Sequence, residues 1–183
     1  MPDTHISSAG FEAGMAREKD SYYESAASYD ALHKEEQVAK ISLILQHLPI
    51  ATHERLLDVG CGTGFSLDYW PCDAYGAEPS LAMIRQAPQR LQERIFHVRA
   101  EDLSIFHDDE FDIVVSITAI HHFAGLEDGL KELRRVGRGR FAFSVLRKSH
   151  RFSLIEKTIR QLFRVERVLE DNPHDSIFLC RKG

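Results

Sequence analysis

Three glycines at alternate positions follow a short apolar segment that contains an acid, and this feature restricts the fold more than any other in the chain. The segment is Arg55–Val59, its acid is Asp58, and the glycines are Gly60, Gly62 and Gly64. Glycine tolerates positive φ angles and lets a ligand approach the backbone closely. A helix after such a loop adds the free N–H groups of its first turn. The segment therefore predicts a strand, a ligand-binding loop and a helix, in that order.

The residues around this loop distinguish between nucleotide cofactors. A dinucleotide fingerprint needs a glycine three places after the second one, and Phe65 occupies that place. Asp58 would repel a pyrophosphate, whereas it attracts an ammonium or sulfonium group in a partly desolvated cleft. S-adenosylmethionine (SAM) carries both cations and no phosphate. The loop therefore favours SAM, with S-adenosylhomocysteine as the product.

A second acid lies where the cofactor's ribose is expected. The predicted strand 74–77 ends at Glu78, twenty positions after Asp58, and a βαβ unit places an acid on the ribose hydroxyls at this distance. Pro79 and Ser80 then end the strand and begin a helix. The alternative is a surface acid at a strand end, but the upstream glycine loop favours the ribose contact.

In their order and spacing, these motifs resemble those of the class I SAM-dependent methyltransferases. The resemblance covers about residues 20 to 183 and is greatest to the branch that mostly methylates small molecules, such as quinone-precursor methyltransferases. The motifs that carry it are 58–64, 76–80, 99–103, 111–116 and 120–123. It implies a transferase of the EC 2.1.1 class that acts on a small-molecule acceptor.

The resemblance also implies the cofactor-binding residues. They are Asp58, Gly60, Cys61, Gly62, Gly64, Glu78, Pro79, Met83, Ala100, Glu101, Asp102, Ser116 and Ile117. One place departs from the family pattern, because Arg99 stands where relatives often carry an Asp that binds the adenine amino group. The adenine contact is left open between Glu101 and Asp102.

Two tyrosines near the N-terminus lie in a segment that resembles the region closing over SAM in this branch. Tyr23 and Tyr29 would donate O–H bonds to the methionine carboxylate while their rings exclude water. Helical spacing equally fits tyrosines packed on the rim of the core. Both interpretations stay open.

His122 is the candidate catalytic residue. A neutral imidazole after the fourth strand can take a proton from the acceptor. The alternative is a packed turn at His121 and His122, which is common in relatives. Methyl transfer also needs no base in principle, since alignment alone can contribute about 7–11 kcal/mol.

Basic residues gather late in the chain, since residues 1–130 are acidic in balance and residues 131–170 are basic. Arg147 and Arg151 follow the fifth predicted strand, so we expect them to border the cleft as contacts for an anionic acceptor. The arginines before that strand instead suit a helix end with its negative dipole. The whole chain is acidic, with a pI near 6.0, which argues against nucleic acid as the main partner.

The apolar pattern alternates between helical and strand-like segments. Helices are predicted at 38–48, 65–69, 80–91, 126–136 and 152–163, and strands at 55–59, 74–77, 95–99, 111–117, 141–146, 165–169 and 176–180. This alternation predicts a doubly wound, Rossmann-like α/β sheet that is mostly parallel. The link 170–175 is too short for a crossover helix, so the last strand should be antiparallel. The family resemblance implies the same seven-stranded sheet.

Length and composition predict a polar tail at residues 1–20 and a single domain at 21–183, since 183 residues with 43% hydrophobic content build one core. No apolar run is long enough for a membrane span or a signal peptide, so we expect a cytoplasmic protein. The three cysteines lack a CxxC spacing, which fits a reducing compartment and gives no metal signature.

Few residues separate the fifth and sixth predicted strands, where small-molecule relatives often insert a substrate lid. The gap from 148 to 164 leaves the acceptor site either shallow or completed by a second subunit, in a homodimer or with another protein. Two hypotheses follow: a free-standing small-molecule methyltransferase, or a SAM-binding subunit or pseudoenzyme that works with a partner. RNA or protein substrates are a further alternative.

Overall fold

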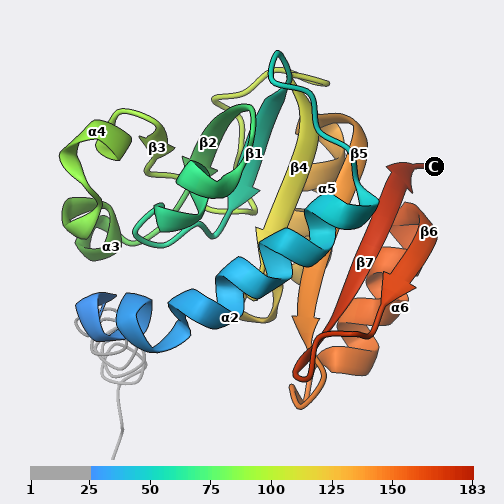
Figure 1. Ribbon diagram of the computed structural model, residues 1–183. Helices are drawn as coiled ribbons and strands as arrows, with labels where there is room; N and C mark the ends of the chain where they lie inside the picture. The colour runs from blue at the N-terminus through green and yellow to red at the C-terminus, as the bar shows by residue number, and fades with distance from the viewer. Residues whose placement is uncertain (1–25) are drawn as a thin grey trace, which may run out of the picture.

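The computed structural model describes residues 26–183, with side chains from Lys34 onward (Figure 1). Tyr23 lies outside the described residues, and Tyr29 lies in a helix of which only the backbone is described there. The division into a tail at 1–20 and a domain at 21–183 stays a prediction for the same reason. The helices are α2 (Ala26–His47), η1 (Phe65–Tyr69), α3 (Leu81–Gln86), α4 (Gln89–Gln92), η2 (Ile120–His122), α5 (Leu126–Val136) and α6 (Phe152–Leu162).

The strands form one seven-stranded sheet in the order β3-β2-β1-β4-β5-β7-β6. Their bounds are β1 (Arg55–Val59), β2 (Asp73–Ala77), β3 (Ile95–Phe96), β4 (Phe111–Ile117), β5 (Gly137–Leu146), β6 (Phe163–Leu169) and β7 (Asp175–Lys182). The pairs from β3 to β5 are parallel, and β7 runs antiparallel to both of its neighbours. The predicted fold class, with its reversed last strand, is confirmed.

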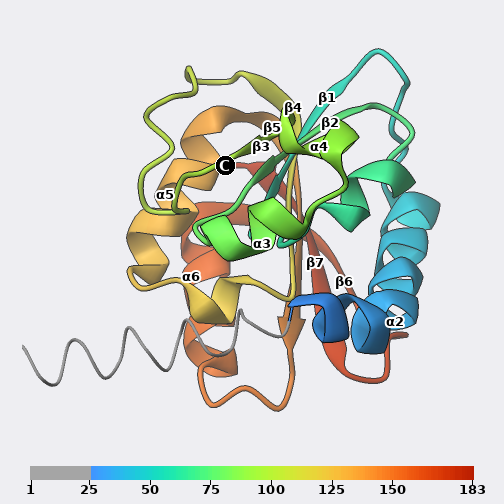
Figure 2. The same ribbon diagram turned by 90° about the vertical axis from the view of Figure 1, so that its left-hand side faces the viewer.

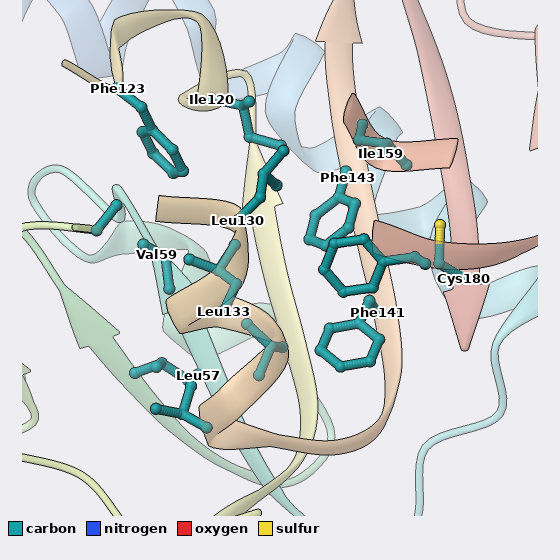
Figure 3. Packing of buried hydrophobic residues seen from close by; sticks show 14 of the residues in the cluster. Leu57, Val59, Ile120, Phe123, Leu130, Leu133, Phe141, Phe143, Ile159 and Cys180 are labelled. Carbon is teal, nitrogen blue, oxygen red and sulfur yellow. The ribbon is translucent and has the colours of Figure 1, made fainter. Parts of the chain in front are cut away.

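Helices cover both faces of the sheet, as Figure 2 shows with the sheet nearly edge-on: α2 lies on one side, and α5 and α6 lie on the other. The α5 and α6 side is packed by leucines and phenylalanines, among them Leu130, Leu133, Phe141 and Phe143 (Figure 3). The α2 side is a separate cluster in which Ile41 and other aliphatic residues of α2 meet the sheet. Each fully buried side chain of this size contributes about 1.5–3 kcal/mol.

The elements differ from the predictions mainly at their ends. The predicted helix 80–91 is two short helices, because Pro88 between them has no N–H to donate. The third strand ends at Phe96 rather than at residue 99. Beyond it the Val98 N–H bonds back to the Phe96 carbonyl, which turns the chain away from the sheet. β5 begins at Gly137, four residues early, since α5 passes directly into it.

Strand β1 and strand β4 are hydrogen-bonded at the centre of the sheet, with Asp58 opposite Val115. On its other side, Asp58 is opposite Gly76 of β2. In a parallel sheet the loops that follow the strands all emerge at the same edge of the sheet. Ligands bind at this edge, at the point where the order of the strands reverses. The sheet order reverses between β1 and β4, so the glycine loop lies at this point.

Candidate active site

The glycine loop after β1 has the backbone that its sequence predicts. Gly60, Gly62 and Gly64 all have positive φ angles, of 83°, 60° and 72°. A Cβ on Gly60 would overlap the Cβ of Ala119 in the loop after β4, and a Cβ on Gly64 would overlap the side chain of Ile95 in β3. The loop therefore packs between the edge strand β3 and the segment that follows β4. Only glycine fits at the two positions where the loop contacts them, Gly60 and Gly64.

A cleft opens above this loop, with about 970 Å³ of empty space when its open mouth is included. Many of the residues predicted from the sequence line it: Asp58, Gly60, Cys61, Gly62, Glu78, Pro79, Met83, Ala100, Glu101, Ile117 and His122. Other lining residues were not predicted as site residues: Gln37, Val59, Phe65, Ser66, Ala77, Arg99, Thr118, Ala119, Phe123 and Ala124. Gly64, Asp102, Ser116, Arg147 and Arg151 do not line this cleft.

Asp58 is almost completely buried at the floor of the cleft, with 2% of its surface exposed. One carboxylate oxygen, Oδ2, accepts a hydrogen bond from Ser66 Oγ at 2.7 Å. The other oxygen, Oδ1, is buried without a hydrogen-bond partner in residues 26–183. Burial raises the pKa of Asp58 to about 7, the Ser66 hydrogen bond opposes this rise, and the charge of Glu78 adds to it. A buried carboxylate with a free oxygen is suited to receive a cation or a proton.

Glu78 is also buried, and both of its oxygens are fixed by backbone donors. Oε2 accepts from the Gly62 N–H and Oε1 from the Ser80 N–H, each at 2.9 Å. Burial raises the pKa of Glu78, while these two hydrogen bonds oppose the rise. Each oxygen keeps a further lone pair for a ligand. The side chain thus joins the glycine loop to the start of α3 and presents acceptors for hydroxyl groups.

Of the two acids considered for the adenine contact, only Glu101 lines the cleft. Its Oε1 accepts from the Gly125 N–H at 3.0 Å, and Oε2 lies 3.8 Å from Arg99 Nε. Asp102 accepts from the Ser104 N–H in the following turn. The geometry therefore favours Glu101 over Asp102, and the contact itself stays a prediction.

Cys61 and Ser116, both predicted to bind cofactor, are buried. The pKa of the Cys61 thiol is raised well above its ordinary value, first by burial and then by the charges of Asp58 and Glu78. Cys61 therefore remains a neutral thiol and packs in the loop. Ser116 donates its hydroxyl to the Val59 carbonyl at 2.8 Å, which ties β4 to β1 just below the cleft.

Both arginines proposed as substrate contacts donate to backbone carbonyls. Arg147 bonds the carbonyls of Asn172 and Asp175 at 2.7 and 2.9 Å, and so fastens the turn before β7. Arg151 Nη1 bonds the carbonyls of His121 and Phe123 at 2.7 and 2.9 Å. These bonds give both guanidinium groups a structural role, and a substrate contact stays a prediction.

The two histidines of η2 differ in their surroundings. Their rings lie with centroids 4.0 Å apart. His122 lines the cleft, whereas the Nδ1 atom of His121 is buried without a partner in the described part of the chain. Burial, followed by the neighbouring His122, lowers the pKa of His121 to about 4. His121 is therefore neutral at physiological pH, and Arg151 holds the turn that carries His122.

A buried polar cluster lies beyond β4, on the side away from the glycine loop. Lys40 of α2 is fully buried, and its Nζ lies 2.6 Å from Glu36 Oε1 and 3.1 Å from Asp175 Oδ2. It also donates to Thr118 Oγ1 at 2.7 Å. The Ser144 and Thr118 hydroxyls donate to the same Asp175 oxygen. This cluster joins α2 to the ends of β4, β5 and the start of β7.

The cluster also fixes one wall of the cleft. Thr118 has a φ angle of +55°, a left-handed conformation that is uncommon for a threonine. The next residue is Ala119, whose Cβ faces Gly60. Sequence reasoning did not identify this cluster, because its members are up to 139 positions apart in the chain, between Glu36 and Asp175. A lysine in a helix with a polar face gives no signal of burial.

The donors and acceptors of the cleft fit SAM. The free Oδ1 of Asp58 matches the ammonium group, the lone pairs of Glu78 match ribose hydroxyls, and the loop at Gly60 admits a ligand close to the backbone. Residues 26–183 contain no group of three or more His, Cys, Asp or Glu side chains that could hold a metal ion. None of the helices within this range is both long and apolar enough to cross a membrane.

Comparisons with known proteins relate this chain to methyltransferases. The family described as a methyltransferase domain matches residues 57–143. A malonyl-[acyl-carrier protein] O-methyltransferase from Enterobacter lignolyticus is 29% identical over 164 residues, which are 86% of this chain and 62% of that protein. The chain spans less than two thirds of the length of the curated relatives that it matches.

Solved structures of low sequence identity share the fold. A SAM-dependent methyltransferase from Aquifex aeolicus superposes with a TM-score of 0.73 at 16% identity, covering 88% of this chain and 98% of its own. A putative methyltransferase from Haloferax volcanii, solved in complex with the Trm112 methyltransferase activator, gives a TM-score of 0.70 at 17% identity and covers 87% and 96%. The motif order and the sheet order agree with the family match, so residues 57–143 form a methyltransferase domain of the class I SAM-dependent kind.

Proposed function

We propose that the protein transfers a methyl group from SAM to a small-molecule acceptor. The observation that carries this proposal is the buried Asp58 carboxylate, which has one oxygen without a partner in residues 26–183 at the floor of the cleft. A buried, unpaired carboxylate is costly, and a bound ammonium group would offset that cost. Glu78, 20 positions later, supplies the acceptors for the ribose.

Orientation is the main source of rate in this proposal. The acceptor nucleophile attacks the methyl carbon of the sulfonium, and its lone pair forms the new bond as the carbon–sulfur bond breaks. Holding the two groups in line can contribute about 7–11 kcal/mol. Gly60 and Ala119 lie so close together that a Cβ built on Gly60 would be 2.4 Å from the Ala119 Cβ, and they would restrict the position of the ligand beside them.

His122 is the candidate general base for an acceptor that must lose a proton. It lines the cleft, and its turn is fixed by the hydrogen bonds of Arg151. General-base catalysis typically contributes about 10²–10⁴-fold in rate. If His122 acts in this way, His122→Gln lowers kcat by that factor and removes the dependence of kcat on the ionisation of His122. If alignment suffices, the substitution changes kcat by less than about tenfold.

An oxygen of a small acid is the acceptor that we favour. The relative from Enterobacter lignolyticus is named as an O-methyltransferase, which supports an oxygen nucleophile. Lys148 and His150 follow β5 and are exposed, so they are available to an anion, whereas Arg147 and Arg151 bond backbone carbonyls. A free carboxylate needs no general base, which agrees with a mechanism dominated by orientation.

Calorimetry with SAM and S-adenosylhomocysteine tests the proposal. We expect micromolar dissociation constants for the wild-type protein, weakened at least about tenfold, or about 1.4 kcal/mol, by Asp58→Asn and by Glu78→Gln. Asp68→Asn, on the same loop-helix segment but paired with Arg90 outside the cleft, serves as the control. Transfer of a labelled methyl group to a panel of carboxylic acids, alcohols and amines then identifies the acceptor class. Absence of SAM binding by a folded wild-type protein would remove the proposal.

A second candidate function is a SAM-binding subunit that a partner protein completes. Only α6 lies between β5 and β6, so the described chain supplies little cover for an acceptor. The Haloferax volcanii protein of similar fold was solved with an activator bound, which is an example of such an arrangement in another protein. SAM binding without turnover on the whole panel, together with recovery of activity on adding cell extract, would favour this candidate.

A further inference from the structure

Two residues other than glycine have a left-handed backbone in residues 26–183, and they lie at the two ends of strand β4. Asp109 precedes the strand, Thr118 follows it, and both have a φ angle of +55°. Asp109 stands in an exposed turn, where a short polar side chain readily adopts this conformation. Thr118 is β-branched, and for such a residue the conformation is a genuine outlier. The backbone of Thr118 is therefore strained.

Three buried side chains hold Thr118 in this conformation. Its hydroxyl accepts a hydrogen bond from Lys40 Nζ at 2.7 Å and lies 3.1 Å from both Ser144 Oγ and Asp175 Oδ2. Its backbone N–H donates to the Ser144 carbonyl at 3.2 Å. Lys40, Ser144 and Asp175 all have 0% of their surface exposed. A strained residue persists only when its surroundings over-determine its conformation, and such residues gather at functional sites.

Thr118 begins the segment that forms the β4 side of the cleft, residues 118–124, which we call the β4 wall. The residues of this wall that line the cleft are Thr118, Ala119, His122, Phe123 and Ala124. The strand order β2-β1-β4 places the wall on the opposite side of the glycine loop from Glu78, which follows β2. Because the acids that match SAM lie at β1 and β2, the β4 side of the cleft is left for the acceptor.

The β4 wall is held at both ends by cations from other elements. Lys40 of α2 holds Thr118 at its start, and Arg151 Nη1 bonds the carbonyls of His121 and Phe123 near its end. Between these two points the His122 N–H donates to the Ala119 carbonyl at 2.9 Å. A change in the backbone at Thr118 would therefore move Ala119 and His122 together.

We infer that the strained turn at Thr118 sets the position of the acceptor, and that Lys40 is a positioning residue that acts through the Thr118 hydroxyl. This inference rests on the proposed function and extends it to residues outside the cofactor motifs. The buried network holds the turn in a conformation that threonine disfavours. Relaxation of the turn moves the β4 wall and leaves the sites at Asp58 and Glu78 unchanged. A misplacement of about 1 Å can lower a rate about 100-fold.

Thr118→Gly tests the inference, because glycine adopts the left-handed conformation without strain but lacks the hydroxyl that Lys40 holds. We expect kcat with the acceptor found in the panel to fall about 100-fold. S-adenosylhomocysteine affinity should change by less than about threefold, since the lost interaction acts on the transition state and not on cofactor binding. The urea midpoint should stay near the wild-type value, because relief of strain offsets the lost hydrogen bonds. Thr118→Ser keeps the hydroxyl and should keep most of the activity.

Asp109→Gly is the matched control, because it makes the same substitution at the same φ angle at the other end of β4. Asp109 pairs with Lys182 and does not line the cleft, so kcat should not change. A second arm tests the role of Lys40. Lys40→Met with Asp175→Asn removes both buried charges and should lower kcat in the wild-type background. It should add less than about twofold to the effect of Thr118→Gly, because the two changes act through one hydroxyl.

Hydrogen exchange follows the β4 wall without any acceptor. Amides of residues 118–124 should exchange at least about tenfold faster in Thr118→Gly than in the wild type or in Asp109→Gly. Unchanged exchange, unchanged kcat, or an equal loss of kcat and S-adenosylhomocysteine affinity would each overturn the inference while leaving the proposed function in place. If the wild type binds SAM but methylates nothing in the panel, the proposed function fails. Unchanged exchange in Thr118→Gly would then overturn the role of Lys40 and Thr118 as well.

Discussion

The two halves of the carboxyl edge of the sheet are built in different ways. At β1 and β2, the cleft consists of a contiguous loop, with Gly60, Gly62 and Gly64 in left-handed conformations and Glu78 tied to the Gly62 N–H. Beyond β4, the wall consists of side chains from four elements, with Lys40 and Asp175 at their centre. The first half depends on backbone shape, and the second depends on buried charge.

This difference has a physical consequence for how each half tolerates change. A glycine loop fails when a side chain is added, since there is no space for it and the backbone angle is unfavourable. A buried ion pair fails when one partner is removed, because the other charge is left without compensation. The first kind of damage should affect ligand binding most, and the second should affect stability most.

Removal of Lys40 should have the largest effect. Lys40→Met leaves the fully buried Asp175 without its counter-charge, so we expect a loss of about 3–5 kcal/mol in the free energy of unfolding, measured by urea denaturation. The double variant Lys40→Met with Asp175→Asn removes both charges and should regain more than half of that loss. Lys34→Met, at an exposed position on the same helix, should change stability by less than about 0.5 kcal/mol. A double variant as unstable as the single one would show that charge is not the cause.

Addition of a methyl group to Gly60 should have the next largest effect. We expect it to weaken cofactor binding rather than stability. Gly60→Ala must accommodate a Cβ against Ala119 at a φ angle of 83°, and the left-handed conformation alone costs about 1–2 kcal/mol. We expect S-adenosylhomocysteine affinity to fall on the order of 100-fold, equivalent to about 2.7 kcal/mol. Gly139→Ala is the control, because nothing lies within 4 Å of an added Cβ there. Normal binding by a folded Gly60→Ala protein would contradict the close approach of these two walls.

The raised pKa of Asp58 predicts a dependence of SAM affinity on pH. With a pKa of about 7 in the free protein, most Asp58 is protonated at pH 6 and ionised at pH 8, and the ammonium group binds the ionised form. SAM affinity should therefore rise by up to about tenfold from pH 6 to pH 8, with proton release on binding at the lower pH. Calorimetry in buffers of different ionisation enthalpy measures this release. Asp58→Asn should remove the slope.

The same pKa shift sets the sign of a stability effect. Between about pH 4 and pH 7 the unfolded chain has ionised Asp58 while the folded protein keeps it protonated, so the unfolded state binds fewer protons. The contribution of Asp58 to stability is therefore present below its unfolded pKa and is lost as the pH rises through 7. Thermal unfolding of wild type and Asp58→Asn over this range should differ in slope in that direction.

Arg147 should have the smallest effect. Arg147→Ala removes two hydrogen bonds to the carbonyls of Asn172 and Asp175, and each is worth about 0.5–1.5 kcal/mol. We expect a drop of a few degrees in the melting temperature and an unchanged SAM dissociation constant. If acceptor KM rises while the melting temperature stays the same, the sequence prediction of a substrate contact holds instead.

The sequence predicts most of the residues that line the β1 and β2 half of the cleft. The strand at 55–59, the glycine loop and Glu78 are consecutive parts of one βαβ unit, so their spacing alone places them together. The place of Arg147 and Arg151 after β5 predicts a position at the cleft edge, but neither residue lines the cleft. Their side chains turn instead to the carbonyls of neighbouring turns. The place of a residue after a strand fixes the position of its backbone. It does not fix the position that the end of a long, flexible side chain reaches.

The sequence by itself determined the class of fold, the reversed last strand and the acids that match SAM, because each depends on residues near one another in the chain. Only the tertiary structure revealed the burial of Lys40 and Asp175. Their partners and neighbours come from distant segments, Thr118, Ser144 and Asp175 among them. Burial and hydrogen-bond satisfaction are properties of packing between such segments, so no local pattern in the chain encodes them.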